Sequence, residues 1–148
     1  MAKFPPPKNV VLYADDDVDD LQMVKEAFQL YSTNVELYMV LDGASALSYL
    51  KDLSSIDSLP CLIILDINLP KLDGKETLRR IRTLDHLKDI PVIFFTTSIS
   101  LHDKEFAERH KAGFITKPLN VSQMEAITDQ FIEHCTDEIR KNISRKIK

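Results

Sequence analysis

Short apolar runs alternate with longer amphipathic stretches along the whole chain. Continuous apolar runs predict buried strands, and apolar residues that recur every three or four positions predict helices. By these rules the sequence predicts five strands, at residues 10–13, 35–41, 61–65, 92–95 and 114–115. Helices are predicted between them from the apolar residues Leu21, Val24, Phe28 and Tyr31, then Ala46, Leu47, Leu50 and Leu53, then Leu78, Ile81 and Leu84, then Phe106 and Ala107.

This alternation of strands and helices is typical of an α/β domain built on a parallel sheet. The run from Cys61 to Leu65 is apolar throughout, which favours a strand that is covered on both faces. With right-handed crossovers the helices lie on both faces, so a doubly wound, five-stranded parallel sheet is predicted. Gly113 is expected to end the fourth helix. A long fifth helix is expected to begin near Asn120.

The 148 residues are expected to form one domain, over residues 9–135, after an N-terminal tail at residues 1–8. Residues 136–148 have two interpretations that stay open. Ile139 and Ile143 continue a helical apolar stripe, which predicts a C-terminal extension of the last helix that pairs with a partner or forms a homodimer. A solvated, basic tail fits the same residues equally well.

Composition argues against several classes of function. The net charge is −4, whereas a nucleic-acid-binding domain carries a basic face. Prolines at positions 5–7 stand where a signal peptide needs an apolar run, and the run at 61–65 is too short to span a membrane. Cys61 and Cys135 lack the close spacing of a metal-binding or redox pair. We therefore expect a cytoplasmic protein that binds neither nucleic acid nor membranes.

Polar side chains follow four of the five predicted strands. Asp15 and Asp16 follow the first, Asp66 the third and Lys117 the fifth, and Thr96 ends the fourth. Ligands of an open parallel sheet bind beyond the carboxyl ends of its strands, so we expect these side chains to share one pocket. Clustered carboxylates repel one another unless a cation joins them. Mg²⁺ (or Mn²⁺) suits such a site, because it binds through one or two carboxylates and leaves room for phosphate oxygens.

The residue types in this pocket predict that a phosphoryl group is transferred to one of its carboxylates. Asp66 is predicted to be the nucleophile because it follows the most apolar strand and precedes a loop that contains a proline. Asp16 would be the main metal ligand, with Asp15 assisting through water. Lys117 and the hydroxyl of Thr96 would neutralise and hydrogen-bond the equatorial oxygens during in-line transfer.

These segments resemble the receiver domains of two-component response regulators, of the chemotaxis-regulator type. The resemblance rests on VLYADDD at residues 11–17, LIILDINLPKLDG at 62–74, PVIFFT at 91–96 and FITKP at 114–118. It implies a flavodoxin-like sheet with the strand order 2-1-3-4-5. It also implies a cis peptide bond between Lys117 and Pro118.

The resemblance further implies a role for each site residue. Asp66 would be the phospho-acceptor, and Thr96 and Phe114 would form a conformational switch. Phe114 fits equally well as a core residue. The metal ligands would be the carboxylates of Asp15, Asp16 and Asp66 and the backbone carbonyl of Asn68.

A protein with these features would be a single-domain response regulator in a phosphorelay. A histidine kinase or phosphotransfer protein would donate the phosphoryl group, and a downstream protein that the sequence does not name would receive the signal. Such a phosphoprotein is not an enzyme for a separate substrate, although it assists its own phosphotransfer and dephosphorylation. One alternative is a Mg-dependent phosphohydrolase with an aspartyl nucleophile, which usually has a second acid where this chain has Asn68. Another is a degenerate receiver that only binds partners, which requires a lost site residue.

The acidic run after the first strand also has a calcium-binding interpretation. Asp15, Asp17, Asp19 and Glu26 have the spacing of EF-hand ligands, but Asp20 stands where the sharp turn needs glycine. A strand precedes the run, where an EF-hand has a helix. Asp17, Asp19 and Asp20 are therefore interpreted as acids that stabilise a helix N-terminus.

Overall fold

The computed structural model describes residues 9–29, 35–53 and 59–134. Five strands form one parallel sheet in the order β2-β1-β3-β4-β5, which confirms the predicted fold class and strand order. The strands are β1 (Asn9–Ala14), β2 (Val35–Val40), β3 (Leu62–Leu65), β4 (Val92–Thr96) and β5 (Gly113–Thr116). The helices are α1 (Val18–Phe28), α2 (Gly43–Asp52), α3 (Gly74–Thr83), α4 (Leu101–Arg109), the short 3₁₀ helix η2 (Val121–Gln123) and α5 (Met124–Glu133).

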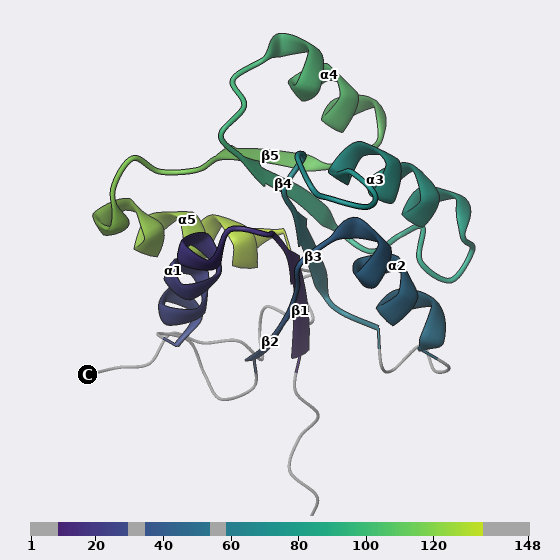
Figure 1. Cartoon of the computed structure of the whole chain (residues 1–148), viewed down its shortest axis with the longest axis horizontal. Coiled ribbons are helices and arrows are strands. Elements are labelled where there is room, and N and C mark those ends of the chain that lie inside the picture. The colour runs from purple at the N-terminus through teal and green to yellow at the C-terminus, as the bar shows by residue number, and fades with distance from the viewer. Residues whose placement is uncertain (1–8, 30–34, 54–58, 135–148) are drawn as a thin grey trace, which may run out of the picture.

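The helices cover both faces of the sheet (Figure 1). α1 and α5 pack on one face, and α2 and α3 pack on the other, with α4 next to β5. Alternate residues of β1 supply the two cores, because successive side chains of a strand point to opposite faces. Val11 and Tyr13 join the cluster under α1 and α5, whereas Leu12 and Ala14 join the cluster under α2 and α3. Double-sided burial therefore explains the continuous apolar runs.

The backbone hydrogen bonds of the sheet extend beyond the ends of its strands. Ala14, the last residue of β1, accepts the backbone N–H of Asp66 at 3.1 Å, and Thr96 accepts that of Lys117 at 2.8 Å. Asp15 and Asp66 thus follow the last residues of the adjacent strands β1 and β3, which are in register with each other. The sheet itself fixes the backbones from which these side chains project.

The expectation that Gly113 ends α4 was wrong. The helix ends at Arg109, and Lys111 adopts the left-handed backbone (φ 57°) that often follows a helix end. Gly113 is instead the first residue of β5. A Cβ at this position would lie 2.7 Å from Nε2 of His134, the residue directly after α5, so a larger residue would have to displace the far end of that imidazole.

The implied cis bond between Lys117 and Pro118 is also not found. All peptide bonds of the described residues are trans. The trans form of a bond before proline is favoured by about 0.5–1 kcal/mol, so it prevails unless the surrounding structure selects the other isomer. After the trans bond to Pro118 the chain reaches Asn120, whose side chain caps η2 by accepting the backbone N–H of Ser122.

Some expectations concern residues outside the described ranges. They are the tail at residues 1–8, Tyr31, Cys135 and the segment 136–148. Among the residues that the structure does describe, no helix combines the length and the apolar character needed to cross a bilayer.

Candidate phosphoryl-acceptor site

The side chain of Lys117 contacts three carboxylates at the carboxyl edge of the sheet. Its Nζ lies 2.8 Å from Asp15 Oδ2, 2.7 Å from Asp20 Oδ2 and 2.8 Å from Asp66 Oδ2. An ammonium has three N–H donors, so each donor has a carboxylate partner. Burial by itself lowers the pKa of Lys117, but the hydrogen bonds to the three carboxylates outweigh burial and raise it. Lys117 is therefore a fixed, permanently charged group.

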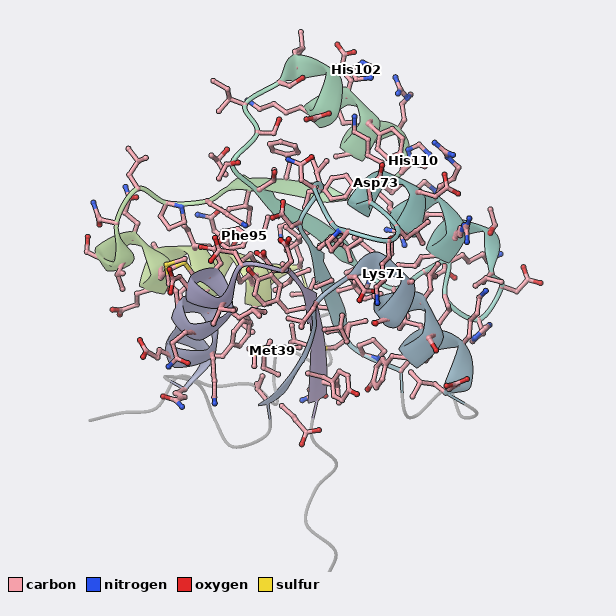
Figure 2. The ribbon with its side chains drawn as sticks, viewed as in Figure 1. Met39, Lys71, Asp73, Phe95, His102 and His110 are labelled. Atoms are coloured by element: carbon pink, nitrogen blue, oxygen red, sulfur yellow. The ribbon has the colours of Figure 1, made fainter. Side chains whose placement is uncertain are left out.

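An aromatic ring supports this ammonium from the core. The centroid of the Phe95 ring lies 5.9 Å from Nζ of Lys117, close enough for a cation–π contact. Phe95 is fully buried in the cluster beneath α1 and α5, near the centre of the molecule in Figure 2. The charged group therefore rests directly on the hydrophobic core.

Asp15 is fully buried and is held by three donors. The hydroxyl of Tyr13 donates to Oδ2 at 2.6 Å, and the backbone N–H of Asp17 donates to Oδ1 at 3.0 Å, in addition to Lys117. Burial, followed by the neighbouring charge of Asp15, raises the pKa of Tyr13, so the phenol keeps its proton. The orientation of the Asp15 carboxylate is thus fixed by the protein itself.

Asp66 is buried beside a loop that approaches it closely. A Cβ on Gly74 would lie 2.2 Å from the carbonyl oxygen of Asp66, so only glycine permits this approach of α3. The N–H of Gly74 donates to the carbonyl of Ile67 at 2.8 Å and fixes the loop. Burial raises the pKa of Asp66, although the hydrogen bond and charge of Lys117 act in the opposite direction. The charged form of the Asp66 carboxylate is therefore stabilised by cations beside it.

Asp15, Asp16 and Asp66 have the composition of a divalent-metal site. Each offers one carboxylate oxygen, and the three oxygens lie within 4.8 Å of one another. Asp16 is exposed and connects the group to solvent. With Asp20 included, the site holds four carboxylates and one ammonium, an excess of negative charge that repels itself. Hard divalent cations prefer such oxygen ligands, so the residues present fit the expected metal.

The remaining predicted site residues lie in different surroundings. Thr96 is fully buried, and its hydroxyl accepts the backbone N–H of Ser98 at 3.2 Å. Phe114 is half-buried and packs against the cluster under α2, α3 and α4, with the ammonium of Lys104 5.9 Å from its ring centroid. The side chain of Asn68 is exposed. Lys117 thus contacts the carboxylates directly, whereas Phe114 lies at the edge of the hydrophobic core.

The contact between Asp20 and Lys117 was not predicted from the sequence. Asp20 does lie in the first turn of α1, where its N–H donates to Asp17, as a helix N-terminal acid should. Its carboxylate also contacts Lys117, 97 positions later in the chain. Helix geometry was only a partial signal: side chains of a first turn tilt back toward the preceding strand end, but the direction of α1 decides whether Asp20 reaches Lys117.

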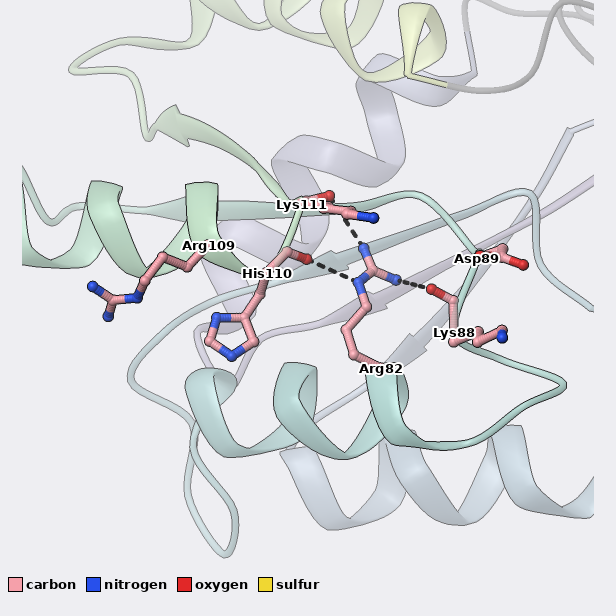
Figure 3. Close-up of a pocket in the computed structure, with 6 residues that line it drawn as sticks. All are labelled: Arg82, Lys88, Asp89, Arg109, His110 and Lys111. Carbon is pink, nitrogen blue, oxygen red and sulfur yellow. Dashed lines mark hydrogen bonds between the residues drawn. The ribbon is translucent and has the colours of Figure 1, made fainter.

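A hollow of about 350 Å³ lies near the amino ends of β4 and β5 and is lined by Arg82, Lys88, Asp89, Arg109, His110 and Lys111 (Figure 3). The guanidinium of Arg82 donates to four backbone carbonyls, those of His110 (2.9 Å), Lys88 (3.0 Å), Ile90 (2.7 Å) and Lys111 (3.2 Å). Because these carbonyls occupy its donors, Arg82 forms a structural junction between two loops. The hollow does not belong to the acidic site.

A family model of the response regulator receiver domain matches residues 11–129. The chain belongs to this family. The receiver domain is 35% identical over 122 residues to response regulator Rcp1 of Synechocystis sp., an alignment that covers 80% of this chain and 82% of Rcp1.

Two solved structures resemble the receiver domain throughout its fold. The crystal structure of the phosphorylated cyanobacterial phytochrome response regulator RcpA matches with a TM-score of 0.77 and 31% identity, and covers 87% of this chain and 97% of that one. The Mn(2+)-bound form of Rcp1 matches with a TM-score of 0.75 and 32% identity, and covers 86% and 97%.

These comparisons confirm the resemblance and the class of function that the sequence predicted. The protein is a response regulator receiver domain that acts in phosphorelay signalling. The phosphohydrolase alternative is not favoured, in agreement with Asn68 at the position where such enzymes usually carry a second acid.

Proposed function

We propose that Asp66 of this receiver domain accepts a phosphoryl group from a phosphohistidine of a histidine kinase or phosphotransfer protein. One observation carries the proposal: Nζ of Lys117 lies 2.8 Å from Asp66 Oδ2, in the pocket where Asp66 meets Asp15 and Asp16. A buried carboxylate beside a fixed ammonium and further acidic oxygens is a suitable acceptor in phosphoryl transfer, which depends on positioning and charge neutralisation.

The transfer exchanges one bond of phosphorus for another. A carboxylate oxygen of Asp66 attacks phosphorus, and the bond to the imidazole nitrogen breaks as the nitrogen keeps the electron pair. Lys117 neutralises charge on the phosphoryl oxygens, and the Thr96 hydroxyl donates a hydrogen bond to them. Later attack of water on phosphorus releases phosphate and restores the carboxylate. The receiver domain thus assists both its phosphorylation and its dephosphorylation.

We assign the metal site to Asp15, Asp16 and Asp66, with the backbone carbonyl of Asn68, and the ion to Mg²⁺. Asp16 would be the main carboxylate ligand, because its exposed side chain lies where an ion enters from solvent. Asp15 would assist through water, since three protein donors already occupy its oxygens. When bound, the ion supplies positive charge that offsets the carboxylates and the incoming phosphoryl oxygens.

Phosphorylation would change the surface of the domain through a switch. The phosphoryl group adds roughly −1.5 to −2 charges near the buried Thr96. We assign the switch to Thr96 and Phe114, which lie on neighbouring strands and lead to the surface of α4, β5 and α5. A downstream protein, or a second copy of the chain, would recognise this surface. A cytoplasmic location follows from the proposal, because histidine kinases take their phosphoryl group from ATP.

The decisive experiment is to incubate the protein with Mg²⁺ and acetyl phosphate and to measure intact mass. We expect one alkali-labile phosphoryl group per chain, no label on Asp66→Asn and normal labelling of the control Asp89→Asn, whose residue lies at the opposite end of the sheet. Retention of the label by Asp66→Asn would contradict the proposal. Repeated turnover of an external phosphoester by the wild type would instead favour a hydrolase.

A further inference from the structure

Asp20 differs from the other two carboxylates that contact Lys117. It comes from the first turn of α1 rather than from a strand end. Its side chain is 22% exposed, whereas that of Asp15 is completely buried. Among the described residues, the acids close enough to share one ion are Asp15, Asp16 and Asp66, without Asp20. Asp20 therefore binds Lys117 without being a member of the metal cluster or the acceptor itself.

The three hydrogen bonds of Lys117 have different fates in the proposed reaction. The N–H that now points to Asp66 is the one that can pass to a phosphoryl oxygen once Asp66 is modified. The bonds to Asp15 and Asp20 can persist, because neither carboxylate reacts. A lysine side chain is long and flexible, so the place of its ammonium depends on such bonds. Without Asp20, the buried Asp15 alone would hold Nζ after the transfer.

We propose that Asp20 is a positioning residue for phosphotransfer, whose carboxylate holds Nζ of Lys117 at the place where the phosphoryl oxygens arrive. This inference rests on the proposed role of Asp66. The opposite effect, in which Asp20 draws Lys117 away from the acceptor, does not fit the geometry. Nζ lies 2.7 Å from Asp20 Oδ2 and 2.8 Å from Asp66 Oδ2, so the first contact is made without loss of the second.

The test compares Asp20→Asn with Asp19→Asn, its matched control. Both substitutions remove one carboxylate from the first turn of α1, but the exposed Asp19 is not among the partners of Lys117. With acetyl phosphate and excess Mg²⁺, we expect Asp20→Asn to be phosphorylated about tenfold more slowly, the scale of one charge-assisted hydrogen bond in the transition state. Asp19→Asn should react at the wild-type rate, and Asp20→Glu should recover part of the loss.

Two further measurements separate positioning from a general structural effect. The slow reaction of Asp20→Asn should persist at saturating Mn²⁺, because Asp20 lies outside the metal cluster. The N–H protons of the Lys117 ammonium, followed through their ¹⁵N signal, should exchange faster with solvent in Asp20→Asn than in the wild type. Circular dichroism checks that each variant is folded.

The outcomes distinguish this inference from the function on which it rests. If the wild type takes no label on Asp66, both are overturned. If the wild type is labelled and Asp20→Asn reacts as fast as Asp19→Asn, or faster, only the positioning role is overturned. Recovery of the wild-type rate by Asp20→Asn at saturating Mn²⁺ would also overturn it, because Asp20 would then act through the metal.

Discussion

The ammonium of Lys75 in α3 lies 2.5 Å from a carboxylate oxygen of Asp103 in α4, and the other oxygen of Asp103 accepts the hydroxyl of Ser98 at 2.6 Å. α4 buries little apolar surface of its own, since its buried residues are Phe106 and Ala107. The contacts of Asp103 with Lys75 and Ser98 therefore do much to hold the first turn of α4 against the rest of the domain.

The substitution Asp103→Ala is expected to lower the free energy of unfolding by about 1–2 kcal/mol, because it removes two hydrogen bonds of a half-buried carboxylate. Amide hydrogen exchange in α4 should become faster than in α3, since the loss is local. Glu105→Ala, on the exposed side of α4, is the control and should change neither quantity appreciably. Equal effects of the two substitutions would show that the contact with Lys75 does not hold the helix.

The junction built on Arg82 gives a second stability prediction. Arg82→Met removes the donors of four backbone carbonyls and should cost about 2–3 kcal/mol of unfolding free energy. Arg82→Lys should recover only part, because an ammonium lacks the planar fork of a guanidinium. Arg79→Met is a matched control on the same helix, since Arg79 makes an exposed ion pair with Glu76 that contributes little. Urea unfolding of the three variants provides the comparison.

Much of the fold could be predicted because its signals are local. The apolar run at 61–65 and the polar residue directly after it, Asp66, identify a central strand and the edge where ligands bind. The ends of helices were harder. Gly113 looked like a helix end, but the left-handed residue is Lys111, and Gly113 lies in β5 beside the imidazole of His134, the residue directly after α5. That contact joins distant segments and leaves no local pattern.

The site shows the same division between local and distant signals. The carboxylates Asp15 and Asp66 follow apolar strands, so parallel topology alone places them together. The partners Tyr13 and Asp20 were not predicted as site residues. Tyr13 occupies a strand position where an aromatic ring is expected to be core, and its hydroxyl becomes important only because Asp15 is within 2.6 Å. The contact of Asp20 depends on the direction of α1, which the sequence pattern does not specify.

Divalent ions should stabilise the folded protein through the acidic cluster. An ion that binds only the folded state adds about 2.7 kcal/mol at a concentration of 100 times its Kd. Thermal melts in EDTA and in Mg²⁺ or Mn²⁺ should show this gain for the wild type. Asp16→Asn should melt higher than the wild type in EDTA, because it removes repulsion, and should gain less from the ion. Asp19→Asn should retain the full gain, and a wild type indifferent to both ions would contradict the metal assignment.

The N-cap of α2 predicts a specific dependence of stability on pH. Asp42 Oδ1 accepts the backbone N–H of Ser45 at 2.6 Å, and Oδ2 accepts its hydroxyl at 3.0 Å. The backbone hydrogen bond from Ser45 lowers the pKa of Asp42, and burial opposes it without reversing it. A carboxyl with a lowered pKa in the folded state stabilises the fold above its ordinary pKa of about 3.9. That contribution disappears as the pH falls through the lowered value.

Asp42→Asn keeps a side chain that can cap the helix but removes the charge. The variant should therefore be less stable than the wild type at neutral pH, and the difference should narrow as the pH falls below about 4. Urea unfolding across this pH range measures the difference directly. Asp52→Asn is the control, because Asp52 is the exposed last residue of α2 and caps nothing at its N-terminus. A difference for Asp42→Asn that stays constant with pH would mean that the shape of the cap, rather than the charge of the carboxylate, stabilises α2.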